Sequence, residues 1–143
     1  AIMACRKDHA QDVKILHDKL KEKESETLEL HKTVYRPWGY YTCLNRGEGY
    51  QTKMICVHPG QKLSIQSHNH RSEHWVVLEG TAFVVLDNEN HTIEAGGSID
   101  IPVKAIHSLQ NPYDTDLKVI EVQKGTILLE SDIIRYQDMY NRV

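Results

Sequence analysis

The 143-residue sequence lacks several features that would each mark a class of protein. It has no run of about 18 apolar residues, the length that a membrane-spanning helix needs, and no charged-then-apolar signal peptide opens it. Its formal net charge is −3 with histidine neutral, so it has no basic excess of the kind that nucleic-acid-binding proteins usually carry. We therefore expect neither a membrane nor a nucleic acid as a partner.

Cysteine is also scarce. The three cysteines, Cys5, Cys43 and Cys56, form no CxxC pair and leave one thiol over if two of them join. We interpret them as reduced thiols that pack as small hydrophobes in a cytoplasmic protein. The chain opens at Ala1 rather than at Met, and we expect it to be part of a longer protein.

Glycine and proline are absent from residues 1–33, which are rich in charge. Asp8 and Gln11 have the spacing of a capping box, in which two side chains satisfy the free N–H groups at the start of a helix. Apolar residues then recur at helical spacing, at Val13, Leu16 and Leu20. The pattern predicts a helix over residues 9–24, followed by a charged linker.

From residue 34 the pattern changes to short β-rich runs separated by Gly, Pro, Asn and Asp. Such runs without helices between them predict a mainly β domain, built as an antiparallel sandwich or barrel. The tail "ESDIIRYQDMYNRV" predicts a short C-terminal helix with Ser131 as its N-cap. The expected strands lie near residues 39–45, 51–58, 62–67, 74–79, 81–86, 90–94, 98–101, 106–110 and 117–123.

The segment "IQSHNHRSEHWVVLEG", residues 65–80, holds three histidines, with Gln66 before them and Glu73 among them. Residues i and i+2 of a strand share a face, so Gln66 and His68 point the same way. We interpret residues 69–72 as a turn and Glu73 as the start of the next strand. His74 then faces away from Glu73, so the two are not expected to bind one ion together.

A second segment, "GGSIDIPVKAIHSLQN", carries His107 on a separate hairpin, from which it can complete a site begun in the first segment. The combined set is one amide oxygen, two imidazoles and one carboxylate, from Gln66, His68, Glu73 and His107. Such ligands suit a divalent first-row metal. Zinc is a good fit, and Fe, Mn, Co and Ni stay open.

The two segments resemble the two conserved motifs of cupins. In the cupin pattern H-x-H-x4-E-x6-G, Glu73 and Gly80 have the correct spacing, and counting back from Glu73 places Gln66 where the first histidine usually stands. Together with "YRPWGYY" and "IEVQKGTILLESDIIRYQDMYNR", residues 34–142 resemble the C-terminal domain of type II phosphomannose isomerases. The resemblance implies a cupin jelly-roll barrel (a double-stranded β-helix) over 34–143, with 1–33 as the tail of a preceding nucleotidyltransferase domain.

The resemblance also implies an activity. It is the metal-dependent interconversion of mannose 6-phosphate and fructose 6-phosphate, in the GDP-mannose route to polysaccharide, by part of a bifunctional mannose-1-phosphate guanylyltransferase. The candidates for acid–base or substrate-orienting roles are His70, Arg71, His74 and Glu121. Candidates for binding the sugar phosphate are Arg36, Lys53 and Arg135. The Gly-rich loop of the nucleotidyltransferase is absent, so we do not expect GMP transfer by this chain alone.

Other interpretations stay open at this point. A non-catalytic cupin that binds a sugar phosphate or sugar nucleotide and regulates the guanylyltransferase is the main alternative, and a cupin oxygenase is a third, which Gln66 and the "HRSEHW" context disfavour. We expect a homodimer, because cupins often associate through sheet edges. Lys104 replaces a glycine common in the second motif. It costs roughly 1 kcal/mol if that turn needs a positive φ, or it places an ammonium near the pocket.

Overall fold

The computed structural model describes residues 32–140, so the helix expected at 9–24 and Cys5 lie outside the described residues. The described chain forms two antiparallel sheets. The first sheet has the order β1 (Thr33–Arg36), β2 (Gly39–Gly47), β3 (Tyr50–Val57), β10 (Leu117–Gly125), β5 (Arg71–Glu79) and β8 (Ser98–Ile101). The second has the order β11 (Ile133–Gln137), β4 (Ile65–His68), β9 (His107–Gln110), β6 (Thr81–Leu86) and β7 (Glu89–Glu94).

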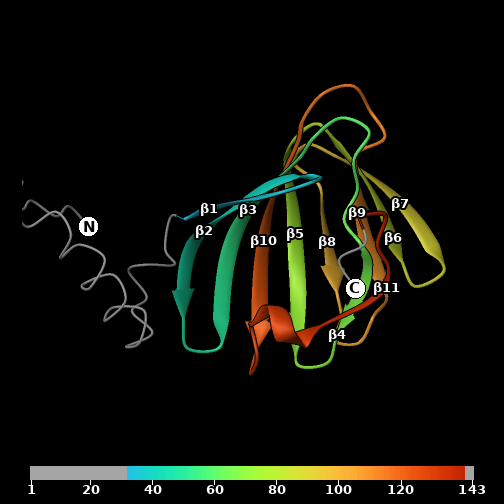
Figure 1. Ribbon diagram of the computed structural model, residues 1–143. Coiled ribbons are helices and arrows are strands. Elements are labelled where there is room, and N and C mark those ends of the chain that lie inside the picture. Colours follow the sequence, from blue (N-terminus) through green and yellow to red (C-terminus); the bar gives the residue numbers. More distant parts are fainter. Residues whose placement is uncertain (1–31, 141–143) are drawn as a thin grey trace, which may run out of the picture.

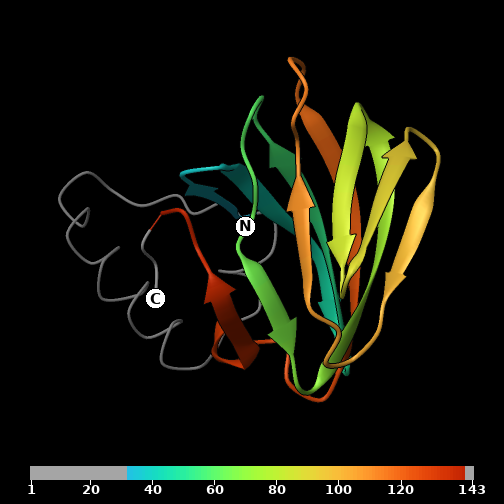
Figure 2. The same ribbon diagram turned by 90° about the vertical axis from the view of Figure 1, so that its right-hand side faces the viewer.

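The core lies between the two sheets. In Figure 1 the strands β2, β3, β10 and β5 stand side by side, and Figure 2, turned by 90°, brings the second sheet to the front. Buried and less buried residues alternate along β5 and β10, as expected for strands with one face on the core. The apolar part of the core includes Trp38, Trp75, Val84, Leu109 and Val119.

All nine strands expected from the sequence are present, with shifts of up to three residues at their ends. Two further strands were not expected, β1 and β11. The predicted C-terminal helix is wrong, because its residues form the short 3-10 turn η3 (Glu130–Asp132) followed by strand β11. Ser131 lies inside η3 rather than at its N-cap, which is Leu129.

The C-terminal segment is extended because it pairs with an edge of the barrel. Strand β11 runs antiparallel to β4, with Ile133 opposite His68 and Arg135 opposite Gln66. This pairing satisfies backbone groups of β4 that would otherwise have no partner on that side. Tertiary pairing therefore overrides the local helical pattern, and it places β11 beside the strand that carries two of the expected metal ligands.

Two turns in the motif segments adopt positive φ. Gly80 has φ +81°, and a Cβ there would lie 2.8 Å from the carbonyl oxygen of Asp116, so only glycine fits without a shift. Lys104 has φ +70°, so this turn does adopt the positive φ that is unfavourable for a lysine. Its N–H donates to the carbonyl of His68 at 2.8 Å, which ties the second motif to the first.

The described residues contain no helix that is long and apolar enough to cross a membrane. Cys43 and Cys56 are both buried, in agreement with the expected packing role.

Candidate metal centre

Three expected ligands from three strands meet in the interior of the barrel. His68 ends β4, Glu73 lies near the start of β5, and His107 begins β9. Each is at most 3% exposed, and one ligand atom from each lies within 4.8 Å of the others. Polar groups this deeply buried require partners. A cation bound between the two imidazoles and the carboxylate would be a partner for all three.

The hydrogen bonds of His107 show how well the group fits a metal. Its Nδ1 donates to the carbonyl of Ala105 at 3.0 Å, which leaves the lone pair of Nε2 free. That Nε2 is buried, has no hydrogen-bond partner in the described part of the chain, and lies 3.7 Å from Oε2 of Glu73. Burial lowers the pKa of His107 although the charge of Glu73 opposes this, so the ring is neutral. A lone pair facing a carboxylate is satisfied by a cation between them.

His68 and Gln66 lie on the same side of β4, as the alternation predicted. Nε2 of His68 is 3.0 Å from Oε1 of Glu73, and its buried Nδ1 has no hydrogen-bond partner among the described residues. Gln66 stands opposite His107 in the β4–β9 pairing, and its Oε1 accepts a hydrogen bond from Ser64 at 2.9 Å. His68, Glu73 and His107 therefore converge, with Gln66 on the neighbouring part of the same strand as His68, and this set of donors suits a divalent metal.

Glu73 is the centre of the polar network. Its carboxylate accepts hydrogen bonds from Arg71 Nε at 3.1 Å, Gln123 Nε2 at 2.9 Å and Trp75 Nε1 at 3.2 Å. Burial by itself raises the pKa of Glu73. The hydrogen bond and charge of His68, together with the charge of Arg71, more than offset this and hold the pKa well below its usual range. Glu73 is therefore ionised and ready to bind a cation.

Glu121 lies next to Glu73 on the neighbouring strand β10. Trp75 Nε1 donates to Oε1 of Glu121 at 3.2 Å, and Lys53 Nζ is 3.8 Å from Oε2. Burial, together with the negative charge of Glu73, raises the pKa of Glu121 to about 8, although Lys53 acts in the opposite direction. The two carboxyl groups thus differ in state at neutral pH: Glu73 is ionised and Glu121 carries a proton.

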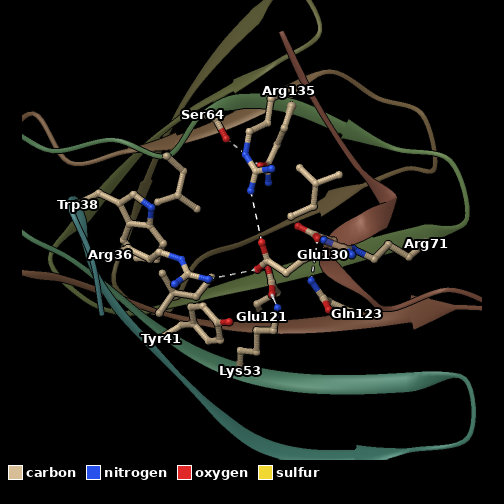
Figure 3. A pocket seen from close by; sticks show the side chains of 15 residues that line it. Arg36, Trp38, Tyr41, Lys53, Ser64, Arg71, Glu121, Gln123, Glu130 and Arg135 are labelled. Atoms are coloured by element: carbon tan, nitrogen blue, oxygen red, sulfur yellow. Dashed lines mark hydrogen bonds and ion pairs between the residues drawn. The ribbon is translucent and has the colours of Figure 1, made fainter. Parts of the chain in front are cut away.

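A small cavity that is partly open to solvent gives access to this network (Figure 3). It brings together two of the expected ligands, Gln66 and Glu73, and all three expected phosphate-binding residues. Sequence reasoning missed Gln123, although it is two residues from Glu121 on the same strand face. The polar and charged lining residues are Arg36, Lys53, Ser64, Gln66, Arg71, Glu73, Glu121, Gln123, Glu130 and Arg135.

The structure does not bring His70 and His74 into this cavity lining. His70 is about half exposed, and its Nδ1 lies 2.7 Å from Oδ1 of the buried Asp132. His74 lies on the opposite face of β5 from Glu73, and its Nδ1 is 2.7 Å from Asp100. Arg71, in contrast, is the first residue of β5 rather than part of the turn, and it is buried against Glu73. The catalytic roles of these residues stay predictions.

Comparison with known proteins identifies relatives of the whole chain. It is 43% identical over 143 residues to the mannose-1-phosphate guanylyltransferase ManC of Salmonella typhimurium, covering 100% of this chain and 30% of that protein. It is 44% identical over 143 residues to the alginate biosynthesis protein AlgA of Pseudomonas aeruginosa, covering 99% of this chain and 30% of that protein. The chain thus spans about a third of the length of these relatives.

The fold has known counterparts as well. An RmlC-like cupin from Shewanella frigidimarina superposes with a TM-score of 0.61 at 21% identity, over 66% of this chain and 84% of that one. The two-sheet barrel is therefore a cupin fold, as expected. The sequence model described as "Mannose-6-phosphate isomerase C-terminal" matches residues 23–138, which is most of the chain. The protein belongs to the mannose-6-phosphate isomerase C-terminal family.

Proposed function

We propose that this chain interconverts mannose 6-phosphate and fructose 6-phosphate with a bound divalent metal, zinc being the best fit. We further propose that it does so as the C-terminal part of a bifunctional mannose-1-phosphate guanylyltransferase in a GDP-mannose route to polysaccharide. The observation that carries the proposal is the buried set of His68, Glu73 and His107 beside an open cavity, in a chain of this family.

Gln66, His68, Glu73 and His107 are the residues that would hold the metal. When bound, the metal supplies an electrophile for the sugar oxygens and lowers the pKa of the hydroxyl groups that it contacts. The surrounding residues orient the ligand carboxylate. Arg71 and Gln123 donate to one oxygen of Glu73 and Trp75 donates to the other, so together they restrict its rotation.

The reaction moves a proton between two neighbouring carbons of the sugar, and Glu121 is the best-placed group to carry it. It faces the cavity, and in the metal-free chain its pKa of about 8 is suited to proton transfer near neutral pH. A divalent cation at Glu73 would offset that carboxylate's charge and bring the pKa of Glu121 down toward its ordinary value, which favours the base form. His70 and His74 are each held by an aspartate outside the cavity lining.

A coupled assay tests the proposal directly. The metal-loaded chain is given mannose 6-phosphate, and formation of fructose 6-phosphate is followed. We expect His68→Ala and Glu73→Ala to abolish turnover, and Glu121→Gln to lower kcat by about 10²–10⁴-fold, the usual contribution of a proton-transfer group. His91→Ala, on the distant strand β7, is the matched control and should keep full activity. Turnover that survives both ligand substitutions would refute the metal-dependent reaction.

A second function is supported by the relatives' names, because ManC is named only as a guanylyltransferase. The chain would then be a non-catalytic module that binds a sugar phosphate and regulates the attached enzyme. The same experiment separates the two functions. A chain that binds mannose 6-phosphate in calorimetry and yet shows no turnover with any divalent metal is a binding module.

A further inference from the structure

One carboxylate is held between two arginines at the mouth of the cavity. Oε1 of Glu130 lies 3.8 Å from a terminal nitrogen of Arg36, and Oε2 lies 3.4 Å from a terminal nitrogen of Arg135. Figure 3 shows the two guanidinium groups approaching this carboxylate from different sides. The arginines come from β1 and β11, which are edge strands of the two different sheets. The cluster therefore bridges the sheets where the cavity opens.

The four cationic side chains that line the cavity fall into two pairs. Arg71 and Lys53 are bound to the buried carboxyl groups Glu73 and Glu121. Arg71 compensates the buried charge of Glu73, so breaking that pair leaves an uncompensated charge. Lys53 is held between Glu121 and the face of the Tyr41 ring. Arg36 and Arg135 instead share Glu130, whose side chain is 53% exposed. A ligand can therefore bind these two arginines by breaking only ion pairs with an exposed carboxylate, and no buried charge is left unpaired.

Both arginines keep capacity for a further anion. Nε of Arg135 is buried and has no hydrogen-bond partner among residues 32–140. The guanidinium of Arg36 lies 5.6 Å from the centre of the Tyr41 ring, which orients it without using its N–H donors. A guanidinium presents five N–H groups, and a planar carboxylate at 3.4–3.8 Å engages few of them.

The side chain of Glu130 is exposed at the start of the turn η3, so it can move while the turn stays in place. The turn is anchored by the buried Asp132, whose carboxylate accepts a hydrogen bond from the backbone N–H of His70 and lies 2.7 Å from Nδ1 of that residue. Exposed ion pairs such as those of Glu130 contribute little to stability. The carboxylate can therefore leave the arginines without disturbing the core.

We propose that Arg36 and Arg135 form the phosphate subsite, and that Glu130 occupies this subsite as an internal anion until a phosphate displaces it. A phosphate dianion carries more charge than a carboxylate and has three acceptor oxygens, so it pairs with two arginines better than Glu130 does. Arg135 stands opposite Gln66 on the neighbouring strand, so the rest of the ligand points toward the metal ligands. The ligand's identity as a hexose 6-phosphate rests on the proposed function.

The arrangement implies selection by charge. A neutral sugar offers nothing that displaces Glu130, so it has to bind beside an occupied subsite. A sugar phosphate replaces one anion by a stronger one. Glu130 thus raises the discrimination between phosphorylated and free sugars at the expense of some affinity for both phosphate and sugar phosphate.

The test is the binding of inorganic phosphate to the whole chain, measured by calorimetry without metal. We expect Glu130→Gln, which keeps the shape and removes the charge, to tighten phosphate binding about three- to tenfold. Arg135→Gln should weaken binding by about tenfold or more. Glu94→Gln removes an exposed charge on β7, at the far edge of the second sheet, and is the matched control that should change nothing.

A double variant separates an internal occupant from a general effect of negative charge. If Glu130 competes for Arg135, the gain from Glu130→Gln largely disappears in the Arg135→Gln background. Equal gains in both backgrounds, or no gain in the wild-type background, would overturn the proposal. Because phosphate binding needs no turnover, this outcome is independent of the isomerase assay, whose failure would leave an intact phosphate subsite in a binding protein.

Discussion

The substitution Glu121→Gln tests the electrostatics of the site in the metal-free protein. In the folded chain Glu121 keeps its proton up to a pH of about 8, whereas a glutamate in the unfolded chain has a pKa near 4.5. Between these values the folded state binds more protons than the unfolded state. The contribution of Glu121 to the free energy of unfolding is therefore fully present below pH 4.5 and is lost as the pH rises toward 8.

The size of the effect follows from the two pKa values. A difference from 4.5 to about 8 corresponds to roughly 3–6 kcal/mol, at about 1.4 kcal/mol for each pH unit. Glutamine does not titrate, and its oxygen still accepts the hydrogen bond from Trp75. The Gln variant should therefore lack this loss. His107, whose pKa is lowered, gives a rise in stability as the pH approaches 6.5. That rise is common to both proteins, so it cancels in their difference.

The assay is urea denaturation, followed by fluorescence, in the presence of a chelator at pH 5, 6, 7 and 8. The stability difference between Glu121→Gln and wild type should move in favour of the variant by several kcal/mol across this range. Adding a divalent metal should reduce the movement, because the cation offsets the charge of Glu73. Parallel curves for wild type and variant would show that Glu121 is ionised in the folded protein at pH 5, and would refute the reasoning.

Three further predictions use other residues. Glu73→Gln should lower the free energy of unfolding of the metal-free chain by about 3–5 kcal/mol in urea denaturation, because it leaves the buried Arg71 without its anion; a loss below about 1 kcal/mol would contradict the central place of this pair. His107→Ala should lower zinc affinity at least about tenfold in a chelator competition, whereas His74→Ala, on the other face of β5, should not change it. Lys104→Gly should raise the free energy of unfolding by about 1 kcal/mol because φ is +70° there, and no gain would show that the lysine is not strained.

The part of the site that the sequence predicted is the part that depends on local geometry. The faces of Gln66, His68, Glu73 and His74 follow from the two-residue period of a strand, and the described strands follow it. The strands themselves were predictable because turn residues separate short β-rich runs. At the C-terminus the same local reasoning failed. Apolar spacing in "ESDIIRYQDMYNRV" favoured a helix. The segment instead forms strand β11, because it pairs with the edge of β4.

By itself, the sequence determined the fold class, the family and the four candidate metal ligands, because motif spacing and strand alternation are properties of neighbouring residues. Tertiary structure alone decided which groups surround those ligands. Gln123 and Glu121 meet Glu73 and Trp75 through the register of β10 with β5, and Glu130 lies between Arg36 and Arg135 because the edges of two sheets come together. Apart from the Glu130–Arg135 pair, these contacts join residues 46 to 94 positions apart, where no local periodicity carries information about which side chains will meet.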